Sequence, residues 1–219
     1  MSERQAGWIG ISACALFWVA LFTFAAARTD YDHLHKAVSE LGVWGAPHAL
    51  AWNLIGFIVP GILLALSGAG LAMAIDGRRG ALWYLLVLPG LCFAGTGVVP
   101  GEMYDGSPVM DSAFTQGHLL FSNLALLLWI CAAFLVIRRV KRNPQWQALT
   151  TRVGIYAALC VGGALVSIVA SAIIPSLAQM PGLAQRIVFA FYFGWFLLMS
   201  LQLCSAVPHA QTETDTAKE

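Results

Sequence analysis

The chain has 219 residues, of which 59% are hydrophobic and 11% are charged, and its formal net charge is +1. A soluble domain is usually about 45–50% apolar and about 25% charged, so the composition excludes an ordinary soluble domain and indicates a membrane protein. No nucleic-acid partner is expected, because nucleic-acid binding needs a strongly basic face. The five cysteines lie in apolar runs without metal or redox spacing, so neither a disulfide framework nor a thiolate metal site is expected. They are Cys14, Cys92, Cys131, Cys160 and Cys204.

Six apolar segments are long enough to cross a membrane, which takes about 20 mainly apolar residues in a helix. They are Trp8–Ala27, Ala49–Ile75, Ala81–Val99, His118–Ile137, Val153–Ile174 and Ile187–Val207. The links between them are polar or rich in Gly and Pro, and the runs are too long for barrel strands. The sequence therefore predicts an all-α bundle of six transmembrane helices. It forms one domain over residues 1–207, followed by a polar, disordered cytoplasmic tail over 208–219.

The basic residues divide unevenly between the two sides of the predicted bundle. Nine of the twelve Lys and Arg lie at the two termini and in the second and fourth links, and three lie in the other links. The three are Arg28, Lys36 and Arg186. Because positive charge stays in the cytoplasm, both termini are predicted to be cytoplasmic. The first, third and fifth links then lie outside, and the protein is expected to be a multi-pass protein of the cell's cytoplasmic (inner) membrane.

Within the spans, Pro60-Gly61 and Pro89-Gly90 predict kinks in the second and third helices. Asn53, Asn123 and Gln202 are the main amides at membrane depth, where interhelical hydrogen bonding is their ordinary use.

A stripe of small residues follows one side of the fifth span. Gly163, Ser167 and Ser171 recur at every fourth position, a spacing that allows helices to approach closely. The stripe predicts packing inside this bundle, and the alternative is a homo-oligomer contact between two copies.

The first link carries the densest group of polar residues. Helical spacing of its apolar residues predicts a short interfacial helix over Asp30–Leu41, which Gly42 would end. Glu40 then has two possible roles. It could pair with Lys36 on a solvated linker, or it could turn inward into the outer mouth of the bundle. Ser39 stands beside it.

Three further polar residues lie at the same level. His118 opens the fourth span, where it could point into the bundle or rest in the interface. Glu102 follows the third span. Arg186 precedes the sixth span, on the side that positive charge avoids, so it is expected to pair with Glu40 or Glu102, or to grip a carboxylate or phosphate.

Metal binding and nucleophilic catalysis find little support in the motifs. His33, His35 and His48 are candidate zinc ligands, but no HExxH or EF-hand spacing accompanies them, so no cofactor is expected. Ser39 could act as a nucleophile with His118 as its base, yet no GxSxG motif is present.

Several short motifs in a fixed order resemble a known family. They are Ser39-Glu40-Leu41-Gly42, Ala46-Pro47, Asn53, Pro100-x-Glu102, Gly117-His118, and Gly182-Leu-Ala-Gln-Arg186 with Trp195. Together they resemble a bacterial and archaeal family of six-span membrane proteins, catalogued as domain of unknown function 998, over Trp8 to Val207. Members often have Asp where this chain has Glu102. The layout is also distantly similar to that of the Frag1/DRAM/Sfk1 membrane proteins. The resemblance implies a six-helix integral membrane protein with its polar signature residues on the outer side, and it implies no particular activity.

Two functional hypotheses follow. In the first, Glu40, Glu102, His118 and Arg186 form a site at the outer mouth that acts on a lipid or lipid-linked substrate. His118 or Glu40 would be its general base, and Arg186 would hold a phosphate. In the second, the same residues form a non-catalytic ion-pair network, a partner-binding surface, or a small-ligand or proton-coupled transport site.

Overall fold

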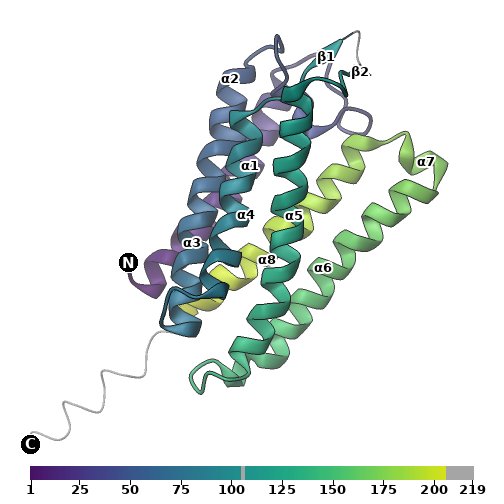
Figure 1. Ribbon diagram of the computed structural model, residues 1–219. Coiled ribbons are helices and arrows are strands. Elements are labelled where there is room, and N and C mark those ends of the chain that lie inside the picture. The colour runs from purple at the N-terminus through teal and green to yellow at the C-terminus, as the bar shows by residue number, and fades with distance from the viewer. Residues whose placement is uncertain (105–106, 206–219) are drawn as a thin grey trace, which may run out of the picture.

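The computed structural model describes residues 1–104 and 107–205 (Figure 1). It confirms the all-α, six-span bundle, because six helices in this part of the chain are long and apolar enough to cross a membrane. These spans are α1 (Glu3–Ala26); α2 (Ala49–Trp52), η2 (Asn53–Ile58) and α3 (Val59–Asp76), which form one span; α4 (Ala81–Val98); α5 (Ala113–Val140); η3 (Gln147–Leu149) with α6 (Thr150–Ile173); and α8 (Pro181–Ser205). The predicted end of the sixth span at Val207 and the tail over 208–219 lie outside the described residues.

The links hold only short elements. The 3₁₀ helix η1 (Val38–Leu41) lies in the first link, and the strands β1 (Met103–Tyr104) and β2 (Ser107–Pro108) form an antiparallel hairpin in the third. The single-turn helix α7 (Pro175–Ala178) lies in the fifth link. These three links gather at one end of the bundle, which is the upper end in Figure 1 and is called the His118 end below.

The spans pack in the spatial order α5, α4, α3, α1, α8, α6, and α6 returns to pack against α5 (Figure 1). The core is unusually aromatic, and its largest fully buried side chains include Trp52, Trp129, Trp195, Phe17 and Phe193. At the opposite end of the bundle, Arg139 lies 3.6 Å from Asp76, and the Asn143 amide donates to the carbonyl of Ile75. These contacts tie the link between α5 and α6 to the end of α3.

The two predicted proline kinks have different outcomes. Before Pro60 the helix widens into the π-helical η2, in which the Val59 N–H donates to the Leu54 carbonyl, five residues back. Proline supplies no N–H to a helix, and a π-bulge is one way to absorb the missing bond. At Pro89, in contrast, α4 continues as a single α-helix.

The small-residue stripe packs inside the bundle in part. Gly163 lies against the ring of Phe191 on α8, so a Cβ there would collide with that ring. The hydroxyls of Ser167 and Ser171 donate to carbonyls of their own helix, at 2.7 and 2.8 Å. A homo-oligomer through this stripe stays a prediction.

The three amide side chains at membrane depth differ in their hydrogen bonding. Gln202 joins α8 to α6 through the Tyr156 hydroxyl at 3.4 Å, as predicted for an interhelical bond. Asn53 instead donates to the Gly42 carbonyl at 2.8 Å and so holds the first link. The Asn123 side chain forms no hydrogen bond to any other described residue, and it borders the cavities discussed next.

Candidate functional site

The first link is not the interfacial helix predicted over Asp30–Leu41, because only Val38–Leu41 is helical. The Asp32 carboxylate explains the difference, since it accepts hydrogen bonds from the Leu34 N–H at 2.7 Å and the His35 N–H at 3.4 Å. Such local side-chain bonds favour a turn over a helix. Lys36 bonds to Asp30 at 3.0 Å and not to Glu40, so the first of the two possible roles of Glu40 is not realised either.

Asp30 is the charged centre of this turn. Its carboxylate accepts hydrogen bonds from Arg28 at 2.7 Å and from Lys36 at 3.0 Å, although its side chain is 55% exposed. The hydrogen bonds from these two cations hold the pKa of Asp30 well below its usual range.

Glu40 does not face inward toward His118 and Arg186, as one of the two predicted roles required. Its carboxylate accepts the Ala37 N–H at 2.8 Å and so caps the 3₁₀ helix that contains it. Its backbone carbonyl accepts a hydrogen bond from Arg28 at 3.0 Å. Glu40 therefore fixes the shape of the first link.

Arg186 does have partners, but they are not carboxylates. Its Nη1 donates to the backbone carbonyls of His33 at 2.7 Å, Gly182 at 2.8 Å and Lys36 at 3.3 Å. Its Nη2 donates to the Tyr31 hydroxyl at 2.9 Å, and the guanidinium stands over the Tyr31 ring. The predicted pairing with Glu40 or Glu102 is therefore wrong.

Two neighbours of Arg186 complete a tight attachment of residues 33–39 to the start of α8, and this segment is called the strap. The Gln185 side-chain oxygen accepts the N–H groups of Val38 at 2.6 Å and Ser39 at 3.3 Å. The backbone carbonyls of the strap lie so close to Gly182 that a Cβ at that position would collide with them. The strap covers the His118 end of the space between α5 and α8.

Glu102 belongs to the base of the hairpin in the third link. Its N–H donates to the Thr115 hydroxyl at 3.0 Å, and its carbonyl accepts the Val109 N–H at 3.0 Å. Its carboxylate is not among the groups that line the cavity beside His118. Asp105 of the same link lies outside the described residues.

His118 is buried in the second turn of α5, where it meets the end of α4. Its Nδ1 lies 2.9 Å from the Thr96 carbonyl and 3.1 Å from the Val99 carbonyl. Carbonyls at a helix end have no partner within the helix, and Pro100 has no N–H to offer them. Because carbonyl oxygens only accept, Nδ1 carries a proton, and in the neutral ring Nε2 keeps a free lone pair.

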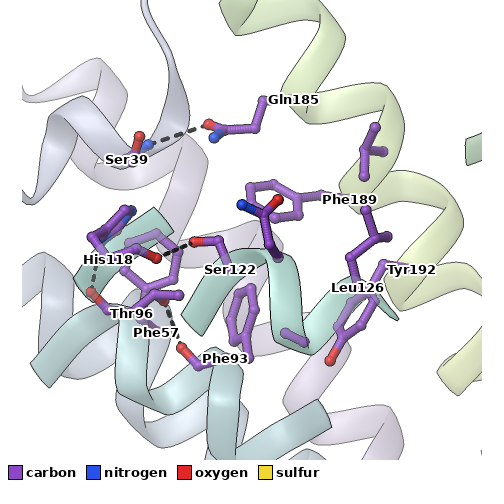
Figure 2. Close-up of a pocket in the computed structure, with 13 residues that line it drawn as sticks. Ser39, Phe57, Phe93, Thr96, His118, Ser122, Leu126, Gln185, Phe189 and Tyr192 are labelled. Carbon is purple, nitrogen blue, oxygen red and sulfur yellow. Dashed lines mark hydrogen bonds between the residues drawn. The ribbon is translucent and has the colours of Figure 1, made fainter. Parts of the chain in front are cut away.

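A cavity of about 140 Å³ lies between His118 and α8. Figure 2 shows His118 and Ser39 on one side of it and Phe189, Leu126 and Tyr192 on the other. Its wall is mainly apolar and aromatic, with a few polar groups. The wall is formed by Ser39, Phe57, Phe93, Thr96, His118, Ser122, Asn123, Ala125, Leu126, Gln185, Val188, Phe189 and Tyr192.

Two hydroxyl groups of this wall are already used by the protein. The Ser122 hydroxyl donates to the His118 carbonyl at 2.9 Å, and the Thr96 hydroxyl donates to the Phe93 carbonyl at 2.6 Å (Figure 2). Among the residues described, no hydrogen bond engages His118 Nε2, the Ser39 hydroxyl, the Asn123 amide or the Tyr192 hydroxyl. These groups are what the cavity offers to a ligand.

A second, larger cavity of about 460 Å³ adjoins the first between α5, α6, α7 and α8. It is called the lateral groove below. The two share Asn123, Leu126, Gln185 and Val188, so only these side chains separate them. The remaining wall includes Ile168 and Leu177 and is mainly apolar.

The candidate zinc ligands do not converge. In residues 1–104 and 107–205, no three His, Cys, Asp or Glu side chains are placed to hold a metal ion. His35 pairs with Asp32 at 2.7 Å, His33 packs edge-on against Tyr31, and His48 packs against Phe24.

The cavity contains several residues for which the sequence analysis predicted no such role. Gln185 had a signal, because it directly precedes Arg186 and follows Gly182 by three residues. Phe93, Phe189 and Tyr192 had none, since aromatic residues at helical spacing are typical of any membrane core. Of the five predicted site residues, only Ser39 and His118 line the cavity.

The comparisons with known proteins identify one family. No curated protein and no solved structure matches the chain. One family model, described as "Protein of unknown function (DUF998)", matches residues 11–202. That range includes His118, the strap and all residues of both cavities. The chain, which has six described helices long and apolar enough to span a membrane, therefore belongs to the DUF998 family.

Proposed function

We propose that this protein binds a membrane lipid or a lipid-linked molecule in the cavity beside His118, with the polar part of that molecule hydrogen-bonded to His118 Nε2. One observation carries the proposal. The imidazole is buried, two carbonyls hold its Nδ1, and no described group bonds to its Nε2, while His118 lines a cavity whose wall is mainly apolar with a few polar groups. Ligand sites in proteins typically combine such an apolar wall with a few placed polar groups.

The surroundings of the cavity favour an amphiphile over a water-soluble ligand. The strap covers the His118 end through Gln185, whereas the lateral groove adjoins the cavity on the side of α6 and α7. A molecule in the membrane could reach the cavity along the lateral groove. Its apolar part would then stay in contact with the apolar wall of that groove.

The catalytic form of the proposal rests on His118 alone. Glu40 caps its own helix and Arg186 holds the strap, so neither is available as a base or a phosphate clamp. In a reaction, His118 would be the general base and Ser39 would supply a free hydroxyl. The same contacts support the non-catalytic alternative, because Arg186 belongs to a structural hydrogen-bond network. The partners of Arg186 in this network are backbone carbonyls and the Tyr31 hydroxyl, and not the acidic side chains of the predicted ion-pair network.

The orientation proposed for the molecule places the His118 end outside the cytoplasm and both termini inside it. The support is the distribution of Lys and Arg, nine against three, in a protein of the cytoplasmic membrane. Single cysteines at Met110 and at Gln145 test it. The proposal expects an impermeant thiol reagent to label intact cells only at position 110, and labelling only at position 145 would reverse the orientation.

Photo-crosslinking tests the binding site. The protein would be placed in lipid nanodiscs with a single-chain amphiphile that carries a hydroxyl head and a diazirine near it. We expect labelling of the wild type on α5 and α8, and loss of labelling in Leu126→Trp, which fills the cavity. His118→Asn is the matched variant, because its amide nitrogen takes the place of Nδ1 while the Nε2 acceptor is removed. Wild-type labelling in both variants would overturn the proposal.

A turnover screen then separates binding from catalysis. The wild type and His118→Asn would be incubated with a total lipid extract and the lipid profiles compared by mass spectrometry. A product formed by the wild type and absent with His118→Asn would support the catalytic form. Identical profiles would contradict that form and leave the lipid-binding proposal to the crosslinking result.

A further inference from the structure

The cavity beside His118 has the size of a single six-membered ring. Its volume is about 140 Å³, and an apolar protein cavity of about 150 Å³ accepts one benzene molecule. A phospholipid head with two ester-linked chains is far larger than this space. The part of the ligand that enters the cavity is therefore limited to a ring or a short length of chain.

The wall of the cavity suits a flat ring. The ring of Phe93 stacks with that of Tyr192 at a centroid distance of 5.8 Å and meets Phe57 edge-on at 5.3 Å. Phe57 in turn meets the imidazole of His118 at 6.1 Å. Aromatic rings pack favourably against one another in such edge and offset geometries. A sugar ring would bring hydroxyls against the rings of Phe57 and Phe93, which have no hydrogen-bonding groups for them.

One free group of this wall can only accept a hydrogen bond, and it defines the polar group of the ligand. His118 Nε2 accepts a proton donor when Nδ1 is bonded to the Thr96 and Val99 carbonyls. A plain hydrocarbon chain would leave that acceptor unused, and burying an unpaired polar group is unfavourable. A hydroxyl on the ring would satisfy it.

The lateral groove supplies the place for a tail. It shares Leu126 and Val188 with the ring cavity, and it continues past Ile168 and Leu177 between α5, α6 and α7. A single hydrocarbon chain attached to the ring could leave through this shared wall, whereas the strap bars the His118 end.

We infer that the ligand class is a prenyl- or alkyl-substituted hydroquinone or phenol, whose ring lies against Phe57, Phe93 and Tyr192, whose hydroxyl donates to His118 Nε2, and whose tail lies in the lateral groove. This inference rests on the proposed lipid-binding function of the same site. It names binding only.

Equilibrium binding of 2-decylhydroquinone to the protein in nanodiscs tests the inference, with reducing conditions throughout and empty nanodiscs to correct for partition. The matched ligand is its dimethyl ether, which keeps the ring and tail and lacks the hydroxyl donors. We expect the hydroquinone to bind the wild type at least about tenfold more tightly than the ether. In His118→Asn this preference should disappear. Equal binding of the two ligands by the wild type, or an unchanged preference in His118→Asn, would overturn the inference.

The tail is tested separately with Ile168→Trp, which fills the lateral groove and does not line the ring cavity. Decylhydroquinone should then bind no better than methylhydroquinone, while the affinity for methylhydroquinone stays at its wild-type value. A tail contribution that survives in Ile168→Trp would contradict the assignment of the groove.

The two proposals fail differently. If the diazirine amphiphile crosslinks in a His118-dependent way and decylhydroquinone does not bind, the hydroquinone inference is wrong and the proposed lipid site stands. If neither ligand shows any dependence on His118, both proposals are wrong.

Discussion

The guanidinium of Arg186 donates to the hydroxyl of Tyr31 at 2.9 Å and lies 5.5 Å from the centre of the same ring. The two residues are far apart in sequence, on α8 and in the first link. Their contact, with three carbonyl acceptors on Nη1, fixes the strap against the bundle. Arg186 therefore acts on the site through the strap that covers it.

Arg186→Lys should destabilise the protein, because an ammonium cannot reproduce a planar fork that serves four acceptors at once. Hydrogen bonds from charged groups are worth about 1.5–3 kcal/mol each, and a loss of about 2–4 kcal/mol in the free energy of unfolding is expected. Equilibrium unfolding in mixed micelles measures it.

Arg142→Lys is the control for this change, since Arg142 is exposed near the opposite end of the bundle. It should alter stability by no more than about 0.5 kcal/mol. If Arg186→Lys were as stable as the control and lost only ligand binding, Arg186 would be a ligand contact and the structural role would be refuted.

Gly182→Ala should also detach the strap. Its Cβ would lie 2.7 Å from the His33 carbonyl and 2.9 Å from the Leu34 carbonyl, where backbone would have to move. Overpacking of this kind costs about 1–3 kcal/mol. Gly194→Ala, on the same helix, meets nothing within 4 Å and should be neutral or stabilising by up to about 1 kcal/mol. Equal effects of the two substitutions on the unfolding free energy would show that the strap tolerates a side chain here.

Gln185→Met should loosen η1 without unfolding the bundle. It removes the oxygen that accepts the Val38 and Ser39 N–H groups and leaves them without that partner. The local opening should become easier by about 1–3 kcal/mol, so amide exchange at Val38 and Ser39 should accelerate at least about tenfold. Gln185→Glu keeps an acceptor and should leave the exchange slow. Fast exchange in both variants, or in neither, would exclude this role of the side-chain oxygen.

The turn around Asp30 should respond to acid only at low pH. The pKa of Asp30 is depressed in the folded protein by Arg28 and Lys36, so its stabilising contribution is present above the unfolded value of about 3.9. The contribution is lost as pH falls below that value and through the folded pKa. Amide exchange of the first link, corrected for intrinsic rates, should therefore be flat from pH 7 to about pH 5 and rise below about pH 4.

Asp30→Asn should reduce this rise and make the link more mobile at every pH, and the part that remains belongs to Asp32, whose pKa is lowered by its hydrogen bonds with His35 and the Leu34 N–H. Because the side chain is largely exposed, added salt should weaken the effect as well. A rise centred near pH 6 would contradict the assignment to Asp30.

The architecture could be predicted from the sequence because length and hydrophobicity alone specify a membrane span. All six predicted spans are present. Their ends differ from the prediction where polar residues extend a helix. The fourth span, for example, begins at Ala113 and not at His118, and the Ser112 hydroxyl caps it by accepting the Phe114 N–H. Hydropathy is insensitive to such caps, so His118 was placed at the start of a helix and lies in its second turn.

The candidate site was harder to predict, because the sequence suggests that charged side chains pair with one another, as in the predicted pair of Arg186 with Glu40 or Glu102. Glu40 and Arg186 both lie at the His118 end of the bundle, yet each of them bonds to nearby backbone groups and they do not bond to one another. Local groups such as the Asp32 carboxylate reshaped the first link, and no helical periodicity reveals that competition. The cavity itself arises from the spacing of α5 and α8, which only the packed bundle determines.

Histidine ¹⁵N NMR in nanodiscs tests the central claim most directly, because the ring nitrogens report which one carries the proton. The assignment of the His118 signals would come from their loss in His118→Asn. We predict a protonated Nδ1 and an unprotonated Nε2 in the free protein, and a change confined to the Nε2 signal when a hydroxyl-bearing amphiphile binds. A protonated Nε2 in the free neutral ring, or an Nε2 signal that the bound amphiphile leaves unchanged, would contradict the account.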